Sequence, residues 1–282
     1  MQPSFLRPEP TRSGILPIRG VAYYYEVMGE GEPLLLLHGG LGSIDMFGPI
    51  LKDLMAQHRV IGGDLHGHGR TTLGDRPLSV LDIADDLAVL LDQLELDRVD
   101  VLGYSLGGAV GFRLAAQHPE RVRRLVMVST GIARDAFYPE ILESQSQLSA
   151  AAAPYMVETP MYAGYMRVAP NPADFPRLLD RIAEALREPY DWSEDARSLG
   201  CETMLIYGDG DMYRLEHIVA FYRLLGGGLR DAGWGREHLS KNRLAILPGL
   251  THYDIFMAPL MVSVALGFLA GGTQAPVLVE AP

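Results

Sequence analysis

A serine framed by glycines is the residue of this chain best suited to nucleophilic chemistry. The motif Gly103-Tyr-Ser105-Leu-Gly107 lies between an apolar run, 99–102, and a segment whose small and apolar residues recur at helical spacing. A strand that turns into a helix within one residue strains its apex, and neighbouring glycines let the two elements pass closely. The apex side chain then precedes a helix N-terminus, which favours a developing negative charge. The pattern predicts that Ser105 attacks a carbonyl group.

A serine hydroxyl needs a base, and that base needs an acid to orient it. Two later loops supply candidates, and each follows an apolar run that predicts a strand. The loop Gly208-Asp-Gly-Asp211 follows residues 204–207, and His252 lies in the loop after residues 244–247. Carboxyl ends of parallel strands meet at one edge of a sheet. We therefore expect a serine, an aspartate and a histidine to meet there, in that chain order.

The elements that must position these residues alternate along the chain. The pattern predicts a β-hairpin of Ile15–Ile18 and Val21–Val27, followed by strands at Pro33–His38, Arg59–Ile61 and Val122–Val128. Between and after these strands it predicts helices at Phe47–Ala56, after the capping residue Ser79, at Leu215–Leu225 and from about Asp254 to Leu269. Such alternation is typical of a parallel sheet with right-handed crossovers. The predicted fold class is therefore α/β, with a mostly parallel central sheet and helices on both faces.

The alternation stops at Ser129 and resumes at Thr203. Residues 131–197 are rich in alanine, methionine, tyrosine and proline and predict a helical cap inserted into the α/β core, which then comprises residues 1–130 and 198–282. The segment Gly226–Asn242 is polar and glycine-rich and predicts a surface excursion. We expect residues 1–12 to form a loose lead-in and 271–282 a frayed tail.

Composition limits the kinds of partner that the protein is expected to bind and the compartment where it is expected to lie. The 282 residues include 24 Lys and Arg against 35 Asp and Glu, a net charge of −11, which argues against nucleic acid or an anionic membrane as partner. The single cysteine, Cys201, allows no internal disulfide and favours the cytoplasm. The first residues lack the apolar region of a signal peptide, and the chain has no run of eighteen apolar residues. The oligomeric state stays open.

Taken together, five motifs make the chain resemble the α/β-hydrolase superfamily, specifically its capped, esterase- or lipase-like serine members. The resemblance implies that Ser105 is the nucleophile and His252 the general base and then acid. It implies that Asp211 is the orienting acid, with Asp209 as the alternative. It also implies an oxyanion hole of the Leu106 and Gly40 N–H groups, with Leu41 as the alternative second donor. The motifs are His38-Gly39-Gly40, Asp64-x-His66-Gly67-His68-Gly69-Arg70, Gly103-x-Ser105-x-Gly107-Gly108, Gly208-Asp-Gly-Asp211 and Pro248-Gly-x-Thr-His252.

The resemblance narrows the reaction but not the substrate. Dehalogenases and epoxide hydrolases of this fold use an aspartate where this chain has Ser105, so a carboxylesterase is predicted. A lactonase, a carbon–carbon bond hydrolase and a slow-turnover ligand sensor are the alternatives. The expected substrate is a small to medium, mostly uncharged ester, because no side chain of the cap is an obvious clamp for charge. Residues expected to line its pocket are Leu41, Tyr104, Tyr138, Met161, Tyr162 and Met166.

No cofactor or metal is expected. The glycines at 39–42 are not followed by the lysine of a phosphate-binding loop. His66, His68 and Asp64 sit in a glycine-rich turn that makes a poor metal scaffold, so His66, His68 and His38 are interpreted as structural residues that bond loop carbonyls. The remaining histidines, His58, His118, His217 and His238, are expected to be solvated on the surface, and Asp254 is expected to begin the last helix.

Overall fold

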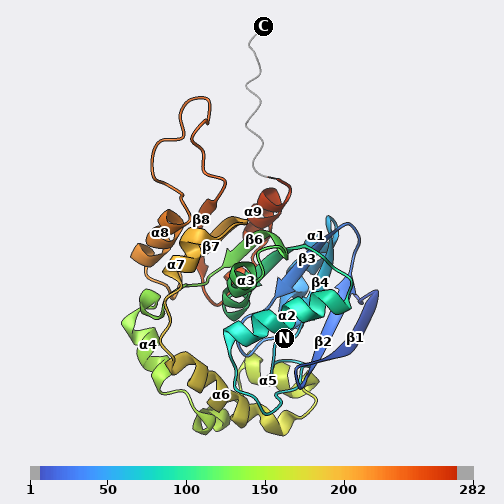
Figure 1. Ribbon diagram of the computed structural model, residues 1–282. Coiled ribbons are helices and arrows are strands. Elements are labelled where there is room, and N and C mark those ends of the chain that lie inside the picture. Colours follow the sequence, from blue (N-terminus) through green and yellow to red (C-terminus); the bar gives the residue numbers. More distant parts are fainter. Residues whose placement is uncertain (1–6, 272–282) are drawn as a thin grey trace.

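The apolar runs of the sequence form a single sheet in the computed structural model, which describes residues 7–271. The eight strands within that range lie in the order β1-β2-β4-β3-β5-β6-β7-β8 (Figure 1). β2 runs antiparallel to β1 and β4, and all other neighbouring pairs are parallel, which confirms the predicted mostly parallel sheet. The strands are β1 Arg12–Ile18, β2 Val21–Met28, β3 Glu32–Leu37, β4 His58–Gly63, β5 Val99–Tyr104, β6 Val122–Val128, β7 Glu202–Gly210 and β8 Arg243–Thr251.

Helices cover both faces of this sheet. Alternate side chains of β3 belong to two different clusters of buried residues, because successive side chains of a strand point to opposite faces. One cluster includes side chains of α2 (Val80–Gln93), α3 (Leu106–Gln117) and α8 (Leu215–Leu224). The other includes those of α1 (Gly48–Met55) and α9 (Pro259–Leu269). The continuous apolar run of β3 is therefore explained by burial on both faces.

Local sequence signals fix several element ends. Arg19 and Gly20, between β1 and β2, have φ angles of 47° and 84°, as a tight hairpin turn requires. The Ser79 side chain accepts a hydrogen bond from the Asp82 N–H at 3.2 Å and caps α2 as expected. The last helix differs from expectation: a 3₁₀ turn spans Ile255–Met257, and α9 begins only at Pro259. Proline lacks an N–H and fits the first turn of a helix, so it starts a new helix here.

Between β6 and β7 the chain forms helices and turns, interrupted at Ala133, Phe137 and Asp191 by isolated β-bridges. The helices are α4 (Pro139–Ser146), α5 (Pro160–Val168), α6 (Phe175–Arg187) and α7 (Ser193–Ser198). α4, α5 and α6 gather at one end of the molecule (Figure 1).

Two contacts attach these helices to loops that follow β3 and β4. Arg167 of α5 forms an ion pair with Asp45 at 3.2 Å, and Leu178 of α6 lies beside Gly67. The helices therefore lie at the carboxyl edge of the sheet, where Ser105 follows β5.

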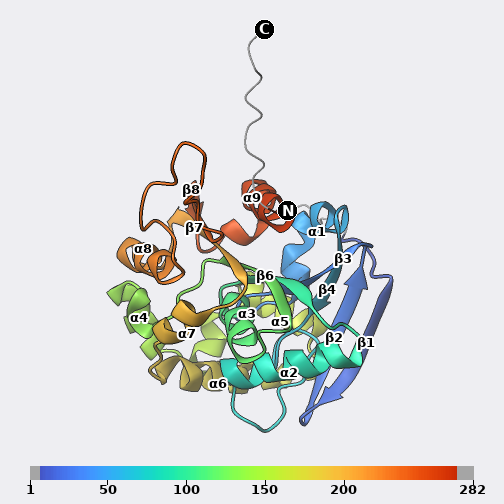
Figure 2. The same ribbon diagram turned by 45° about the horizontal axis from the view of Figure 1, so that its top comes forward.

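The segment 226–242 contains no helix or strand and extends away from the body of the protein (Figure 2). The lead-in is shorter than expected, since Arg12 already pairs with Val27 in the β1–β2 ladder. Residues 1–6 of the lead-in and 272–282 of the expected tail lie outside the described residues. Among residues 7–271, no helix has both the length and the apolar character needed to cross a membrane.

Candidate active site

Ser105 occupies a strained turn between β5 and α3. Its φ and ψ are 53° and −117°, an arrangement that a residue with a side chain rarely adopts. The turn is tight enough to require glycine at its flanks: a Cβ on Gly107 would lie 2.2 Å from the Leu37 carbonyl oxygen of β3. The backbone strain and the close approach together present the serine side chain at the carboxyl edge of the sheet, as its motif predicts.

Ser105, His252 and Asp211 form one hydrogen-bonded row. The Ser105 Oγ lies 3.1 Å from His252 Nε2, although the two residues are 147 positions apart in the chain. His252 Nδ1 lies 3.2 Å from Asp211 Oδ1. With a neutral imidazole, the serine hydroxyl donates to Nε2 and the Nδ1–H donates to the carboxylate. This is the arrangement in which an imidazole can take the proton of a serine that attacks.

The alternative acid, Asp209, points elsewhere. Its Oδ1 accepts a hydrogen bond from the Gly249 N–H at 2.7 Å, so this side chain fixes the loop after β8 instead of contacting His252. Asp254 serves the same loop, because its Oδ1 accepts from the Thr251 N–H at 2.7 Å. Asp254 precedes a 3₁₀ turn and not the expected α-helix.

Both oxygens of Asp211 are held by donors besides His252. Oδ1 also accepts from the Met212 N–H at 2.8 Å. Oδ2 accepts from the Ser129 hydroxyl and, at 3.4 Å, from the Gly208 N–H. Ser129 is not among the residues predicted from the sequence to belong to the site. The sequence nevertheless indicates its place: Ser129 directly follows the predicted strand that forms β6, so its side chain lies at the sheet edge where the other site residues lie.

Tyr104 differs from expectation. It is only 6% exposed, and its hydroxyl donates to the His252 carbonyl oxygen at 2.6 Å. Its ring lies 5.2 Å from the His252 imidazole and 4.9 Å from the Phe256 ring, between centroids. Burial raises the pKa of its phenol. Tyr104 therefore holds the histidine loop in place, and its buried side chain is not free to line an open substrate pocket.

Two backbone N–H groups are candidates for an oxyanion hole. Leu106 is the first residue of α3, so its N–H has no partner within the helix. Gly39 lies against the serine turn, since a Cβ built there would be 3.4 Å from the Ser105 Cβ. Gly40 follows it in open space, and Leu41 has a φ of 56°. The Gly40 loop therefore approaches the serine turn from β3, and the Leu106 N–H from α3.

Three buried histidines hold the loops around the site. The ring N–H groups of His38, His66 and His68 donate to the backbone carbonyls of Gly39, Leu73 and His66, at 2.7, 2.7 and 2.8 Å. His38 also accepts from the Leu65 N–H at 2.9 Å. Burial lowers the pKa of each ring to about 4, so all three are neutral at pH 7. Within residues 7–271, no cluster of three or more His, Cys, Asp or Glu is arranged to hold a metal ion.

The expectation for the other histidines is partly wrong. His58 is buried, at 5% exposure, because it starts a strand in the middle of the sheet. His217 is partly buried and accepts from the Ile132 N–H at 3.4 Å, and burial lowers its pKa. His118 Nε2 lies 2.8 Å from Asp85 Oδ1. His238, exposed in the 226–242 excursion, is placed as expected.

The pocket role of Leu41, Tyr138, Met161, Tyr162 and Met166 stays a prediction. Tyr162 and Met166 line an apolar cavity of about 420 Å³ between α5 and α6, together with Phe175, and no residue of the serine, histidine and aspartate row lines it. Tyr138 and Met161 are exposed, and Leu41 is partly buried beside Gly40.

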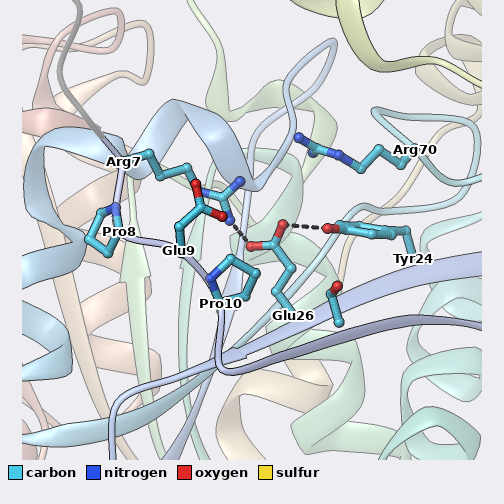
Figure 3. A pocket seen from close by; sticks show the side chains of 8 residues that line it. Arg7, Pro8, Glu9, Pro10, Tyr24, Glu26 and Arg70 are labelled. Atoms are coloured by element: carbon cyan, nitrogen blue, oxygen red, sulfur yellow. Dashed lines mark hydrogen bonds and ion pairs between the residues drawn. The ribbon is translucent and has the colours of Figure 1, made fainter.

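A second cavity, of about 340 Å³, lies between residues 7–10 and the side of β2 that carries Tyr24 and Glu26 (Figure 3). Glu26 at its floor forms an ion pair with Arg7 and accepts a hydrogen bond from the Tyr24 hydroxyl at 2.6 Å. None of the expected site residues lines this cavity. Two of its charged side chains, Arg7 and Glu26, are paired with each other.

The sheet order, the helices on both faces and the serine turn after β5 define an α/β hydrolase fold. A comparison with known families agrees, because the family described as alpha/beta hydrolase fold matches residues 32–160. A putative carbamate hydrolase RutD from Azorhizobium caulinodans is 34% identical over 202 residues, which is 70% of this chain and 69% of that protein. The chain therefore belongs to the alpha/beta hydrolase family. Several other relatives match over 33–55% of their own length.

Solved structures share this fold at low sequence identity. The carboxylesterase CesB from Bacillus subtilis superimposes with a TM-score of 0.71 at 18% identity and covers 96% of this chain and 95% of its own. The enol-lactonase from Burkholderia xenovorans does so with a TM-score of 0.68 at 19% identity, over 91% of this chain and all of its own. At such identities the likeness concerns the fold alone.

Proposed function

We propose that this protein is a serine hydrolase that cleaves small to medium, mostly uncharged carboxylic esters through an acyl-enzyme. The observation that carries the proposal is the row from the Ser105 Oγ through His252 to Asp211, with contacts of 3.1 and 3.2 Å. Ser105 attacks the ester carbonyl carbon while His252 takes its proton. The tetrahedral intermediate then loses its alcohol, which receives that proton from His252. Water, activated by the same imidazole, attacks the acyl group and frees the acid.

In this mechanism the negative oxygen of each intermediate binds the N–H groups of Leu106 and Gly40. The α3 N-terminus adds its dipole to the Leu106 donor. One such donor contributes about 10²–10³ in kcat in comparable sites. Leu41 is the alternative second donor, because it follows Gly40 in the same turn.

The substrate class follows from the charges near the site. We propose that residues 131–197 act as a cap that covers the acyl and alcohol groups. Arg167 of α5, a cation that could bind a substrate carboxylate, is already paired with Asp45 at 3.2 Å. This pairing favours an uncharged substrate.

A lactone is an ester, and the same row suits its opening. Two similarities make a lactonase or a carbamate hydrolase the second candidate: the fold of a lactonase and the sequence of a relative named as a putative carbamate hydrolase. A carbon–carbon bond hydrolase or a slow-turnover ligand sensor would use the same three side chains. These alternatives differ in substrate and rate, so one set of assays separates them.

The test is a panel of p-nitrophenyl esters of graded acyl length, with a lactone, a carbamate and a vinylogous diketone. We expect turnover of the short esters, and a loss of about 10⁶ in kcat for Ser105→Ala and similarly for His252→Ala, because the three residues act as a unit. A Ser105→Ala protein that keeps most of its activity would exclude the mechanism. Tight binding of a panel compound with negligible turnover would identify a sensor instead.

A further inference from the structure

Ser129 lies outside the proposed row, and its side chain contacts the Asp211 carboxylate. It follows β6, is fully buried, and has a φ of 49°. Its N–H donates to the Ile206 carbonyl of β7 at 2.8 Å, which fixes the backbone. Its hydroxyl donates to Asp211 Oδ2. The serine therefore joins the end of one strand to the acid that follows the next.

We propose that Ser129 is a positioning residue for hydrolysis: its hydroxyl fixes the plane of the Asp211 carboxylate so that Oδ1 faces His252. This proposal rests on the proposed function, since it concerns the same row. Oδ1 is held by the Met212 N–H, whereas within residues 7–271 the only other donor to Oδ2 is the Gly208 N–H at 3.4 Å, a long hydrogen bond. Without the hydroxyl, one end of the carboxylate is weakly held and the group rotates about its Cβ–Cγ bond.

The backbone supports this assignment. A left-handed φ costs a residue with a side chain about 1 kcal/mol or more, and glycine avoids that cost. Ser129 keeps both the strained φ and a hydroxyl pointing at a carboxylate, which is the pattern of strain kept for a function. The next residue, Thr130, has its hydroxyl 3.0 Å from the Ser105 carbonyl oxygen. The end of β6 thus contacts both the serine turn and the acid.

Two substitutions separate the hydroxyl from the backbone strain. Ser129→Ala removes the hydroxyl and keeps the strain, whereas Ser129→Gly removes the hydroxyl and relieves the strain. We expect both to lower kcat on p-nitrophenyl butyrate by about tenfold or more with little change in KM. We also expect both to move the acid-side midpoint of the pH profile downward, because a carboxylate that rotates away from Nδ1 stabilises the imidazolium less. The melting temperature should separate them, with Ser129→Gly above Ser129→Ala.

The control is Ser79→Ala, which removes the cap of α2 and lowers stability away from the site. It should leave kcat and the pH profile unchanged. Retention of wild-type kcat and pH profile by both Ser129 variants, in a protein that Ser105→Ala inactivates, would overturn this proposal and leave the proposed function intact. Equal activity of wild type and Ser105→Ala would instead overturn the proposed function.

A readout independent of turnover completes the test. The Nδ1–H of His252 is expected to give a downfield proton resonance in the spectrum of the full chain, identified by its loss in His252→Ala. Both Ser129 variants should shift this resonance, and Ser79→Ala should not. An unmoved resonance in both Ser129 variants would overturn the positioning role even in a protein that hydrolyses none of the esters.

Discussion

Asp209 and Asp211 belong to one short loop, yet their side chains have different partners. Asp209 accepts from the Gly249 N–H, and Asp211 contacts His252. β7 ends at Gly210, so the backbone changes direction between the two aspartates. The sequence offers both acids, because it does not specify where the β7–β8 ladder stops. The direction of each carboxylate is set by that ladder.

Substitution of each aspartate by asparagine tests this assignment. Asp211→Asn loses the charge that stabilises the imidazolium and orients the ring, so kcat on p-nitrophenyl butyrate should fall by about 10⁴. Asp209→Asn keeps an amide oxygen able to accept from the Gly249 N–H and should retain kcat within about twofold. Steady-state kinetics of the two purified variants provide the measurement. A large loss in Asp209→Asn with an active Asp211→Asn would reverse the assignment.

At the scale of elements, the β5–turn–α3 unit is the part of the fold that the local sequence predicts most strongly. Gly107 is needed because α3 starts against the backbone of β3. The spacing of glycines around Ser105 indicates this close approach without any knowledge of the partner strand. Other ends depend on single residues in the same way, such as Ser79 at the start of α2 and Pro259 at the start of α9.

Gly107→Ala should therefore destabilise the fold strongly. Its Cβ would meet the Leu37 carbonyl oxygen at 2.2 Å, and backbone cannot move aside as a flexible side chain can. We expect the free energy of unfolding to fall by about 3 kcal/mol. The matched control is Gly164→Ala in α5, where a new Cβ meets nothing within 4 Å and should add roughly 0.5–1 kcal/mol. Urea denaturation would measure both, and equal stabilities would contradict the argument.

At the scale of the whole molecule, arginine side chains attach the helices between β6 and β7 to the core. Besides the Arg167–Asp45 ion pair, Arg177 of α6 donates to the Gly74 carbonyl, and Arg181 donates to the Asp75 carbonyl at 3.2 Å. These contacts join segments about a hundred positions apart. They hold the proposed cap on the edge that carries Ser105.

The buried histidines predict how the stability of the whole molecule depends on pH. The pKa of His38, His66 and His68 is about 4 in the folded protein, against about 6.5 for an unfolded histidine. Between these values the unfolded chain binds more protons than the folded one. The free energy of unfolding should therefore fall as the pH falls from 6.5 towards 4, with a slope approaching about 1.4 kcal/mol per pH unit for each histidine.

Urea titrations at pH 6.5, 5.5 and 5.0 measure this slope. His66→Gln removes one of the three groups and should make the slope smaller. The control is His238→Gln in the exposed excursion, which leaves the buried cluster intact and should change the slope less. A free energy of unfolding that does not change over this range would show that the three rings are not held neutral by the fold.

The sequence by itself determined the alternation of strands and helices, the serine turn, the capping of α2 and the helical character of the insertion. These features depend on residue type and short-range spacing, because backbone sterics and burial act on each residue and its near neighbours. Only the tertiary structure decided that Asp211 and not Asp209 contacts His252, that Tyr104 and His58 are buried, and that Ser129 contacts Asp211. These depend on strand register and on which loops meet across the sheet edge. Contacts between residues 41 to 147 positions apart leave no local pattern in the chain.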